Sequence, residues 1–255
     1  MNRLRVLLAS IAVIVALTVI VSCAGSSGGG GNTAPGGSQS TSSTSESAVT
    51  TETPSAADSP TAPVIPDGFV EYTNNTLNFS MHYPVEWMVL DESYNLDDLM
   101  AEMNEMFGEA ADDMMEVVNL DFSNIVVMWL DFENMTDDFC PNVNLVSEHI
   151  GSDITLNDLK LPELQSDVQD MFEELYQQIY DRFTSVSDIA GKAYGNNYFL
   201  IYQFEADLGG IEMSACQAIT IVDEVMYTFT YTVPSGQMSA FINLFESMLP
   251  TFSAN

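Results

Sequence analysis

The fold of this chain is decided by the stretch Leu77-Asn78-Phe79-Ser80-Met81-His82-Tyr83-Pro84-Val85-Glu86-Trp87. Apolar and polar residues alternate from Leu77 to Tyr83, which is the pattern of a strand with one buried face. Pro84 ends this strand, because proline has no backbone N–H to donate to a neighbouring strand. A second short strand is predicted from Trp87 to Leu90, so the folded part of the chain opens with β structure.

Five further strands are predicted downstream of this stretch. The apolar run at 125–132 is rich in β-forming residues, and the next strand continues from Val143 to Ile150. Three more strands follow at 197–205, 211–222 and 225–233. Tight turns of the hairpin type stand between these three strands, which makes them antiparallel neighbours. The turn residues are Leu208-Gly209-Gly210 and Asp223-Glu224.

Three helices are predicted where apolar residues recur with a period of 3.6. The first covers about 96–118. The second is long, with Thr155 and Asp158 in a helix-start capping arrangement and Pro162 near its beginning. The third is expected to be capped by Ser235. The apolar faces of the second and third helices are formed by Leu164, Val168, Met171, Phe172, Leu175, Ile179 and Phe183, and by Met238, Phe241, Ile242, Phe245 and Leu249.

Hairpin-joined strands with helices inserted between them are typical of an α+β fold. We therefore predict a mainly antiparallel sheet flanked by helices, in an α/β/α sandwich. The predicted domain, 67–255, has 189 residues. That length is sufficient for a full hydrophobic core in a single unit.

Four pieces of the sequence carry a resemblance to PsbP/DcrB-like domains, in which a phrase ending in Tyr-Pro-x-x-Trp follows the first strands. The first piece is Asn75-Thr76-Leu77-Asn78-Phe79-Ser80-Met81-His82-Tyr83-Pro84-Val85-Glu86-Trp87. The others are Pro141-Asn142-Val143-Asn144-Leu145-Val146, Val225-Met226-Tyr227-Thr228-Phe229-Thr230-Tyr231 and Phe245-x-x-Met248-Leu249-Pro250-Thr251-Phe252. Together they cover nearly the whole of 67–255.

The resemblance implies an α/β/α sandwich of the kind shared by photosystem accessory proteins and the Ran-binding protein Mog. It implies no catalytic residues, and in this group the domain usually binds or assists another protein. On this view Pro84 stops a strand and Trp87 is a core aromatic residue. The step from fold to role is analogy, because one fold hosts many functions.

The N-terminal residues resemble a bacterial lipoprotein signal. Arg3 and Arg5 precede an uncharged apolar run, and Ile20-Val21-Ser22-Cys23 resembles a lipobox, with an aliphatic residue, a tolerant position, a small residue and cysteine. Cleavage before Cys23 is predicted, with a diacylglyceryl group on its sulfur, whose two acyl chains suffice for stable anchoring. The alternatives are a plain signal peptide and an uncleaved N-terminal anchor.

The chain is thus predicted to have three parts. Residues 1–22 are a signal peptide. Residues 23–66 are the lipidated Cys23 and a linker of Gly, Ser, Thr, Ala and Pro, too poor in large apolar residues to fold. Its 43 residues after Cys23 span roughly 35 Å as a flexible coil. The domain at 67–255 is therefore expected on the extracytoplasmic face of a membrane, tethered by lipid.

The charge of the chain excludes two classes of partner. Removal of Arg3 and Arg5 lowers the number of basic residues from 5 to 3 and takes the formal charge from −32 to −34. Nucleic acid and anionic lipid headgroups repel so acidic a protein. Two explanations for the charge stay open: a solvated surface suited to a salty medium, or a face for a cationic ligand.

Two cysteines, Cys140 and Cys216, remain if Cys23 is lipidated. An even number in an oxidising compartment makes a disulfide between them a candidate. Two separate buried thiols are the alternative. Pairing requires that the loop before Asn142 lies beside the 211–222 strand.

No catalytic constellation is found. The only histidines, His82 and His149, both fall in predicted strands, and their spacing resembles neither a metal pair nor a triad. The protein is therefore predicted not to be an enzyme and to carry no cofactor.

Two segments bear on cation binding. Asp91 to Glu102 approximates a calcium loop, but Leu96 stands where the sharp turn needs glycine. Met100, Met103 and Met106 share a helical face on which thioethers suit Cu(I), although methionine also fills core gaps. No metal ligands are assigned. The leading function hypothesis is a non-enzymatic lipoprotein that binds or supports another envelope component, and the alternative is a substrate- or cation-binding lipoprotein (Ca²⁺ or Cu⁺) serving a transporter.

Overall fold

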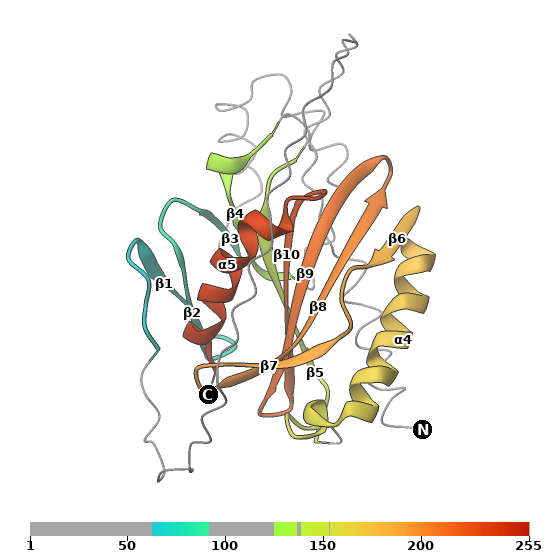
Figure 1. Cartoon of the computed structure of the whole chain (residues 1–255). Helices are drawn as coiled ribbons and strands as arrows, with labels where there is room; N and C mark the ends of the chain where they lie inside the picture. The colour runs from blue at the N-terminus through green and yellow to red at the C-terminus, as the bar shows by residue number, and fades with distance from the viewer. Residues whose placement is uncertain (1–62, 92–124, 137–138, 153, 255) are drawn as a thin grey trace, which may run out of the picture.

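The centre of the molecule is an antiparallel sheet of eight strands (Figure 1). The structure is a computed structural model that describes residues 63–91, 125–136, 139–152 and 154–254. Seven strands form a continuous path, and the eighth, β7, pairs with the far end of β8. Their order is β3 (Met88–Asp91), β4 (Ile125–Leu130), β5 (Asn142–His149), β10 (Val225–Pro234), β9 (Ile211–Val222), β8 (Asn197–Leu208) and β6 (Arg182–Ser185), with β7 at Ala190–Tyr194.

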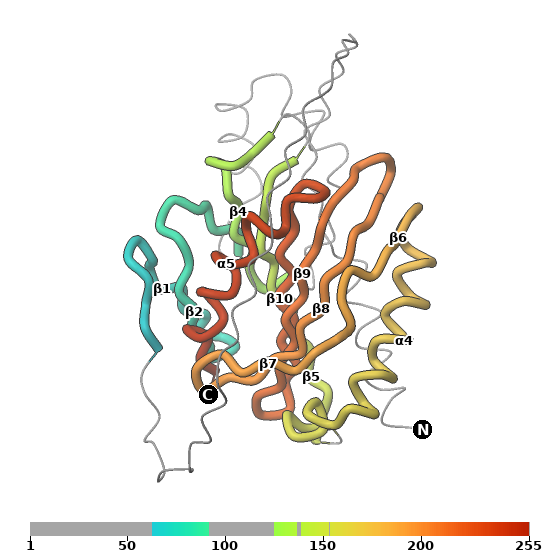
Figure 2. Tube along the Cα trace, viewed as in Figure 1, coloured from blue at the N-terminus to red at the C-terminus, as the bar shows by residue number. Residues whose placement is uncertain are grey.

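A second, smaller sheet has three strands in the order β1 (Phe69–Asn74), β2 (Phe79–Pro84) and β11 (Ser253–Ala254). Here the end of the chain returns to the first hairpin, as the trace in Figure 2 shows. The Asn74 side-chain oxygen closes the hairpin loop by accepting the backbone N–H groups of Thr76 and Leu77. Asn78 takes a φ of 55°, which asparagine tolerates better than most residues.

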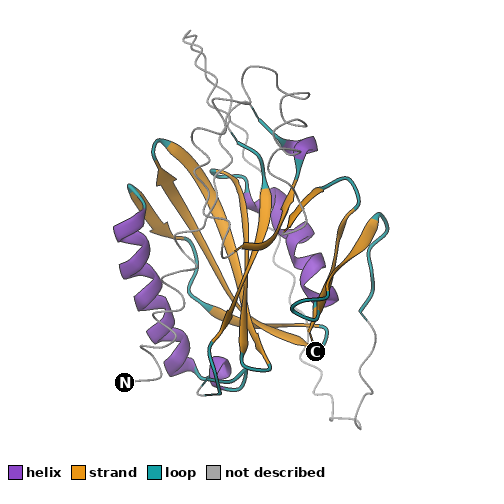
Figure 3. Ribbon diagram, turned by 180° about the vertical axis from the view of Figure 1, so that it is seen from behind, coloured by secondary structure: helices purple, strands orange, loops and turns teal. Residues whose placement is uncertain are grey.

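Two helices cover opposite faces of the large sheet, with the small sheet beside one of them (Figures 1 and 3). Helix α4 (Pro162–Ile179) packs over β8 and β9, and α5 (Met238–Met248) packs with the small sheet on the other face. Among the described residues, three short 3₁₀ helices connect these elements. They are η2 (Phe132–Asn134), η3 (Asp158–Lys160) and η4 (Leu249–Thr251).

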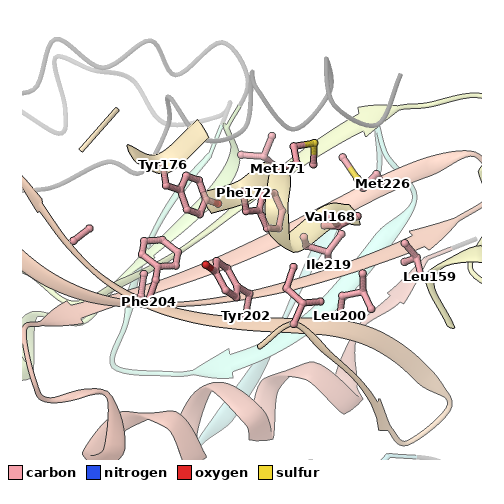
Figure 4. Packing of buried hydrophobic residues seen from close by; sticks show 14 of the residues in the cluster. Leu159, Val168, Met171, Phe172, Tyr176, Leu200, Tyr202, Phe204, Ile219 and Met226 are labelled. Atoms are coloured by element: carbon pink, nitrogen blue, oxygen red, sulfur yellow. The ribbon is translucent and has the colours of Figure 1, made fainter. Parts of the chain in front are cut away.

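Successive side chains of each strand point to opposite faces of the sheet. On β10, Tyr227, Phe229 and Tyr231 join the cluster beneath α5. On β9, Ile219 and Ile221 join the cluster beneath α4. Figure 4 shows that second cluster, with Phe172 and Tyr176 of α4 among the residues labelled with those of the sheet. We call these two sides the α5 face and the α4 face.

The predicted α+β class, with a mainly antiparallel sheet flanked by helices, is confirmed by this architecture. Strand β9 matches its predicted bounds, and β8 and β10 extend their predictions by a few residues. Within the residues that the structure describes, no helix is both long and apolar enough to cross a membrane. The helix predicted at about 96–118 lies outside the described residues.

Several local predictions were wrong. Strands β1, β6, β7 and β11 were not predicted, and Phe183, placed on the long helix, lies in β6. The helix ends earlier because Tyr180 leaves the helical conformation, with φ −92° and ψ 142°. The Thr155 backbone N–H and hydroxyl do donate to Asp158, but this turn leads into η3, and α4 starts at Pro162.

The last helix also begins differently from its prediction. Its N-cap position is Gln237, and no side chain caps it. The Ser235 hydroxyl donates instead to the Glu205 carboxylate, 3.0 Å away. A hydrogen bond to a charged acceptor is stronger than one to a neutral acceptor. The Ser235 side chain therefore bonds to Glu205 of β8 and does not cap the helix.

Candidate functional site

Cys23, the predicted lipidation site, lies outside the described residues, as does the linker up to residue 62. Its lipidation stays a prediction. Most residues of the two cation hypotheses also lie outside the described residues. Only Asp91 of the approximate calcium loop is described, and Met100, Met103 and Met106 are not. Asp91 accepts a hydrogen bond from the Tyr72 hydroxyl at 2.9 Å.

The structure does not bring Cys140 and Cys216 together. Cys216 lies in β9 opposite Tyr231 of β10, and Cys140 precedes β5, on the other side of β10. Two strand spacings, about 10 Å, exceed the Cα separation that a disulfide spans. Burial raises the pKa of the Cys216 thiol far above its ordinary value, which keeps it protonated and unreactive.

The two histidines are also apart. His149 is exposed, and its Nε2 lies 3.8 Å from a carboxylate oxygen of Glu224. His82 lies in β2, where its backbone N–H donates to the Thr251 hydroxyl at 2.9 Å. In the described ranges, no three His, Cys, Asp or Glu side chains gather in a way that would hold a metal ion.

A buried group of polar side chains crosses the α4 face and is the most unusual feature of the described residues. Its central row runs straight across four strands through the paired residues Asn144, Thr230, Gln217 and Tyr202. Asn142, Thr228 and Thr232 flank this row on β5 and β10. We call these seven residues the polar patch; none exposes more than 3% of its surface.

One end of the polar patch is locked by hydrogen bonds to α4. The Tyr176 hydroxyl donates to Gln217 Oε1 at 2.5 Å, and Gln217 Nε2 donates to the Thr230 hydroxyl at 3.2 Å. Burial raises the pKa of Tyr176 well above its ordinary value and that of Tyr202 to about 12. Both phenols therefore stay neutral near pH 7, and the polar patch carries no charge.

The rest of the polar patch is only partly satisfied. Asn142 Nδ2 donates to the Cys140 carbonyl at 3.1 Å, and the Thr232 hydroxyl donates to the Asn142 carbonyl at 3.5 Å. The Tyr202 hydroxyl, at the far end of the row, has no partner.

Asn144 Nδ2, Asn142 Oδ1 and Thr228 Oγ1 are shut off from solvent without a hydrogen-bond partner. Buried polar atoms in folded proteins are bonded in the great majority of cases. Four such atoms on this side of the adjacent strands β5 and β10, the three named and Glu148 Oε2, therefore mark this part of the sheet.

The sequence does contain these residues in a regular pattern, but the pattern misleads. Asn142 and Asn144 alternate with Val143 and Leu145, and threonines alternate with aromatic residues along β10. Such alternation normally indicates a sheet with one solvated face. Only the tertiary structure shows that the polar side is buried as well.

The small sheet carries a shallow hollow of about 190 Å³ on its outer side. Hydroxyls of Thr73, Ser80 and Ser253 line it, together with Glu71 and the amides of Asn75 and Asn78. Apart from Phe79, which is buried in the core, the named lining is polar. It offers a small ligand little apolar surface, which binding sites usually provide.

The outer surface is dominated by carboxylates. Helix α4 has five acidic residues among its 18 and no basic one. The three basic residues of the described domain each have a nearby partner. Arg182 bonds Glu212, Lys192 bonds Glu246 at 2.7 Å, and Lys160 stands 5.2 Å from the centre of the Tyr198 ring. Hydrogen bonds to these carboxylates raise the pKa of both Arg182 and Lys192.

Comparison with known proteins finds relatives in structure only. No family model matches the chain, and no curated protein matches its sequence. A cyanobacterial PsbP (CyanoP) from Synechocystis sp. PCC 6803 is similar at a TM-score of 0.47 and 12% identity, over 74% of this chain and 93% of that one. The Saccharomyces cerevisiae Ran-binding protein Mog1p is similar at a TM-score of 0.40 and 10% identity, over 73% of this chain and 95% of that one.

A third similar structure is LpqN of Mycobacterium tuberculosis, described as involved in cell envelope biogenesis. It has a TM-score of 0.40 and 7% identity, over 72% of this chain and 89% of that one. A PsbP and a Mog protein, whose fold the sequence motifs resemble, are thus both among the structures similar to this chain.

Proposed function

We propose that this protein is an extracytoplasmic lipoprotein, held to a membrane through Cys23, whose domain binds or supports another protein of the cell envelope. The observation that carries the proposal is the order of the N-terminal features. A basic start, an apolar run, Ile20 to Cys23 and a Gly/Ser/Thr-rich linker precede a folded domain. Cleavage at Cys23 would leave the domain on a long tether, free to reach a partner.

The surface of the domain supports a binding role for a particular class of partner. Its carboxylates are spread over the exposed side of α4 and beyond, and Arg182 and Lys192 are paired with carboxylates. Such a surface attracts a protein with a basic contact region and speeds their encounter at low salt. The proposed partner is therefore a basic envelope protein, and nucleic acid is not a partner.

The anchoring part of the proposal is tested with Cys23→Ala. Wild-type protein is expected in the membrane fraction, with a mature N-terminus at Cys23 that carries the mass of a lipid. Cys23→Ala is expected to be released or to remain unprocessed, and Cys140→Ala is the matched control that stays lipidated. A wild-type chain that begins elsewhere and carries no lipid would refute anchoring.

The binding part is tested by crosslinking in intact cells followed by purification through this chain. A specific envelope protein is expected to be captured, and its yield is expected to fall when salt is raised before crosslinking. A matched pair of variants separates charge from fold. Asp167→Asn with Asp170→Asn removes two carboxylates from α4, and Ser166→Ala with Gln177→Ala, also on exposed positions of α4, leaves the charge unchanged. Equal capture by both pairs would remove α4 from the contact.

A further inference from the structure

The hollow on the outer side of the small sheet has a floor of hydroxyl groups. Thr73 of β1, Ser80 of β2 and Ser253 of β11 are paired directly across the three strands, and all three line the hollow. Paired residues point to the same face, and neighbouring strands lie about 4.8 Å apart. The three hydroxyls therefore form one row, which is complete only because the end of the chain returns to the first hairpin.

Other polar groups stand at the two ends of this hydroxyl row. Glu71 lies two residues before Thr73 on β1, so its side chain is on the same face. Asn75 and Asn78 belong to the loop that joins β1 to β2. All of them line the hollow. The row is thus bordered by a carboxylate on one side and by two amides on the other.

Side-chain hydrogen bonds hold two of the elements that form the hollow. In the hairpin loop, Asn74 Oδ1 accepts the backbone N–H groups of Thr76 and Leu77 at 3.0 and 2.9 Å. Just before β11, the Phe252 carbonyl accepts a hydrogen bond from Asn197 Nδ2 at 2.6 Å. A guest therefore meets groups that are already positioned, which reduces the entropy lost on binding.

The charge of the hollow favours a cationic guest. Glu71 is exposed, and among the described residues it forms no ion pair. An anionic guest would be repelled by this carboxylate and by a chain with 37 acidic and 5 basic residues. A neutral guest would only exchange its hydrogen bonds to water for similar ones. Hydrogen bonds between ionised partners are stronger, so a positive charge supplies the net attraction.

The size of the hollow suits the end of one side chain. Its volume of about 190 Å³ is below the range of about 300–1,000 Å³ that is typical for whole small molecules. A guanidinium group has five N–H donors in a planar fork. It can bond a carboxylate twice and keep donors for neighbouring hydroxyls, whereas an ammonium group is a compact and strongly hydrated charge. Arginine therefore matches the hollow better than lysine.

We propose that the hollow receives an arginine side chain of the partner protein, with its guanidinium on Glu71 and on the hydroxyl row. This inference rests on the proposed function, in which the partner is a basic envelope protein. A second copy of this chain is a poor guest, because Arg182, its one arginine outside the predicted signal peptide, already pairs with Glu212. The small sheet and α4 lie on opposite sides of the large sheet (Figure 1), so the hollow can be tested separately from the α4 carboxylates.

The direct test uses the full-length chain in detergent and the capped peptide acetyl-Gly-Arg-Gly-amide as the probe. Backbone amide shifts in NMR spectra follow the titration, and saturable shifts are expected at Thr73, Ser80 and Ser253. The same peptide with citrulline, which keeps the shape of arginine without its charge, is expected to bind about fivefold more weakly. Glu71→Gln is expected to weaken binding of the arginine peptide to the same extent, the upper end for an exposed ion pair.

Glu86→Gln is the matched control. It removes the same charge from an exposed position that does not line the hollow, so the affinity for the arginine peptide is expected to stay at the wild-type value. Absence of shifts at the hydroxyl row, equal binding of the two peptides, or equal weakening by Glu71→Gln and Glu86→Gln would overturn the inference.

Crosslinking in cells separates this inference from the proposed function. Glu71→Gln is expected to capture less of the envelope protein than wild type or Glu86→Gln. Equal capture by all three would overturn the inference and leave the proposed function standing. Capture of no protein by wild type, together with binding of the arginine peptide at the hollow, would count against the proposed function and not against the arginine site.

Discussion

The two faces of the large sheet are built from the same strands and differ in kind. The α5 face is continuous and mainly aromatic. Phe252 there lies within 5.1 to 6.3 Å, ring centre to ring centre, of four other aromatic rings. The α4 face is apolar beneath α4 and polar across β5 and β10. The α5 face therefore contributes mainly apolar packing, although it also buries the Trp129 Nε1 and Tyr231 hydroxyl groups, whereas the α4 face carries a row of hydrogen-bonding side chains.

The difference between the two faces indicates which of them contributes more to the stability of the domain. Burial of apolar side chains is the main favourable term in folding, and the α5 face joins the small sheet and the end of the chain to the large sheet. A polar group adds little when it is bonded and subtracts when it is not. We therefore expect the α5 face to dominate the free energy of unfolding.

The largest effect is expected from Phe252→Ala on the α5 face. Removing a ring that contacts four others leaves a cavity and should lower the free energy of unfolding by about 3–5 kcal/mol. Urea denaturation followed by tryptophan fluorescence measures it. Phe252→Leu is the control and should lose under about 1.5 kcal/mol. A loss below about 1 kcal/mol for Phe252→Ala would show that the small sheet is not held by this cluster.

The next effect separates bonded from unbonded groups on the α4 face. Tyr176→Phe removes the hydroxyl that donates to Gln217 and leaves the buried Gln217 Oε1 without a hydrogen bond. This change should lower the free energy of unfolding by about 1–3 kcal/mol. Thr228→Val removes a hydroxyl that has no partner, so it should change stability by less than about 0.5 kcal/mol. Urea curves for both variants check this, and equal losses would contradict the assignment of partners.

The two faces are expected to respond alike to alkaline pH. Burial raises the pKa of Tyr194, on the α5 face, and of Tyr202, on the α4 face, to about 12, against about 10 when unfolded. Between these values the unfolded chain loses protons that the folded one keeps. Stability is thus complete below pH 10 and declines as the pH rises towards 12.

Replacing Tyr194 or Tyr202 with phenylalanine tests this loss of stability at alkaline pH. Tyr194→Phe or Tyr202→Phe should each reduce the slope of unfolding free energy against pH, between pH 10 and 12, by up to about one proton. Tyr198→Phe on β8 provides the comparison. An unchanged slope in one of the two variants would mean that the corresponding face opens before its tyrosine titrates.

The smallest effect is expected at the turn that joins β9 to β10 and belongs to neither face. Asp223 and Glu224 both have positive φ, 47° and 68°, a conformation that is unfavourable for residues with a Cβ. Glu224→Gly should raise the free energy of unfolding by up to about 1 kcal/mol, measured by urea denaturation. Glu224→Ala, which keeps the Cβ, should bring no such gain.

Much of the fold could be predicted from local patterns in the sequence. Strand β9 and the turn after it were located by their β-forming residues and by a two-residue turn, and α4 by its apolar face. The missed strands β6 and β7 are short edge strands, mostly exposed. In β7 only Tyr194 is buried, and in β6 only Phe183 is a large apolar residue, so neither segment shows an apolar pattern long enough to predict a strand.

The candidate site could not be predicted, for a different reason. Asn142, Asn144 and Thr228 look like solvent-facing residues of half-buried strands, since alternation is the same whether the polar side meets water or protein. The separation of Cys140 from Cys216 depended likewise on β10 lying between β5 and β9. Strand order joins residues far apart in the chain, and local periodicity carries no information about it.

The sequence by itself determined the α+β class, the strands of the central hairpins, the acidic character of the surface and the predicted anchoring through Cys23. Each of these rests on composition or on neighbours within a few residues. The tertiary structure alone decided which strands adjoin, that the polar side of β5 and β10 is buried, and that four side-chain atoms there lack partners. Burial is a property of what packs on a face, and packing is set by contacts between residues distant in the chain.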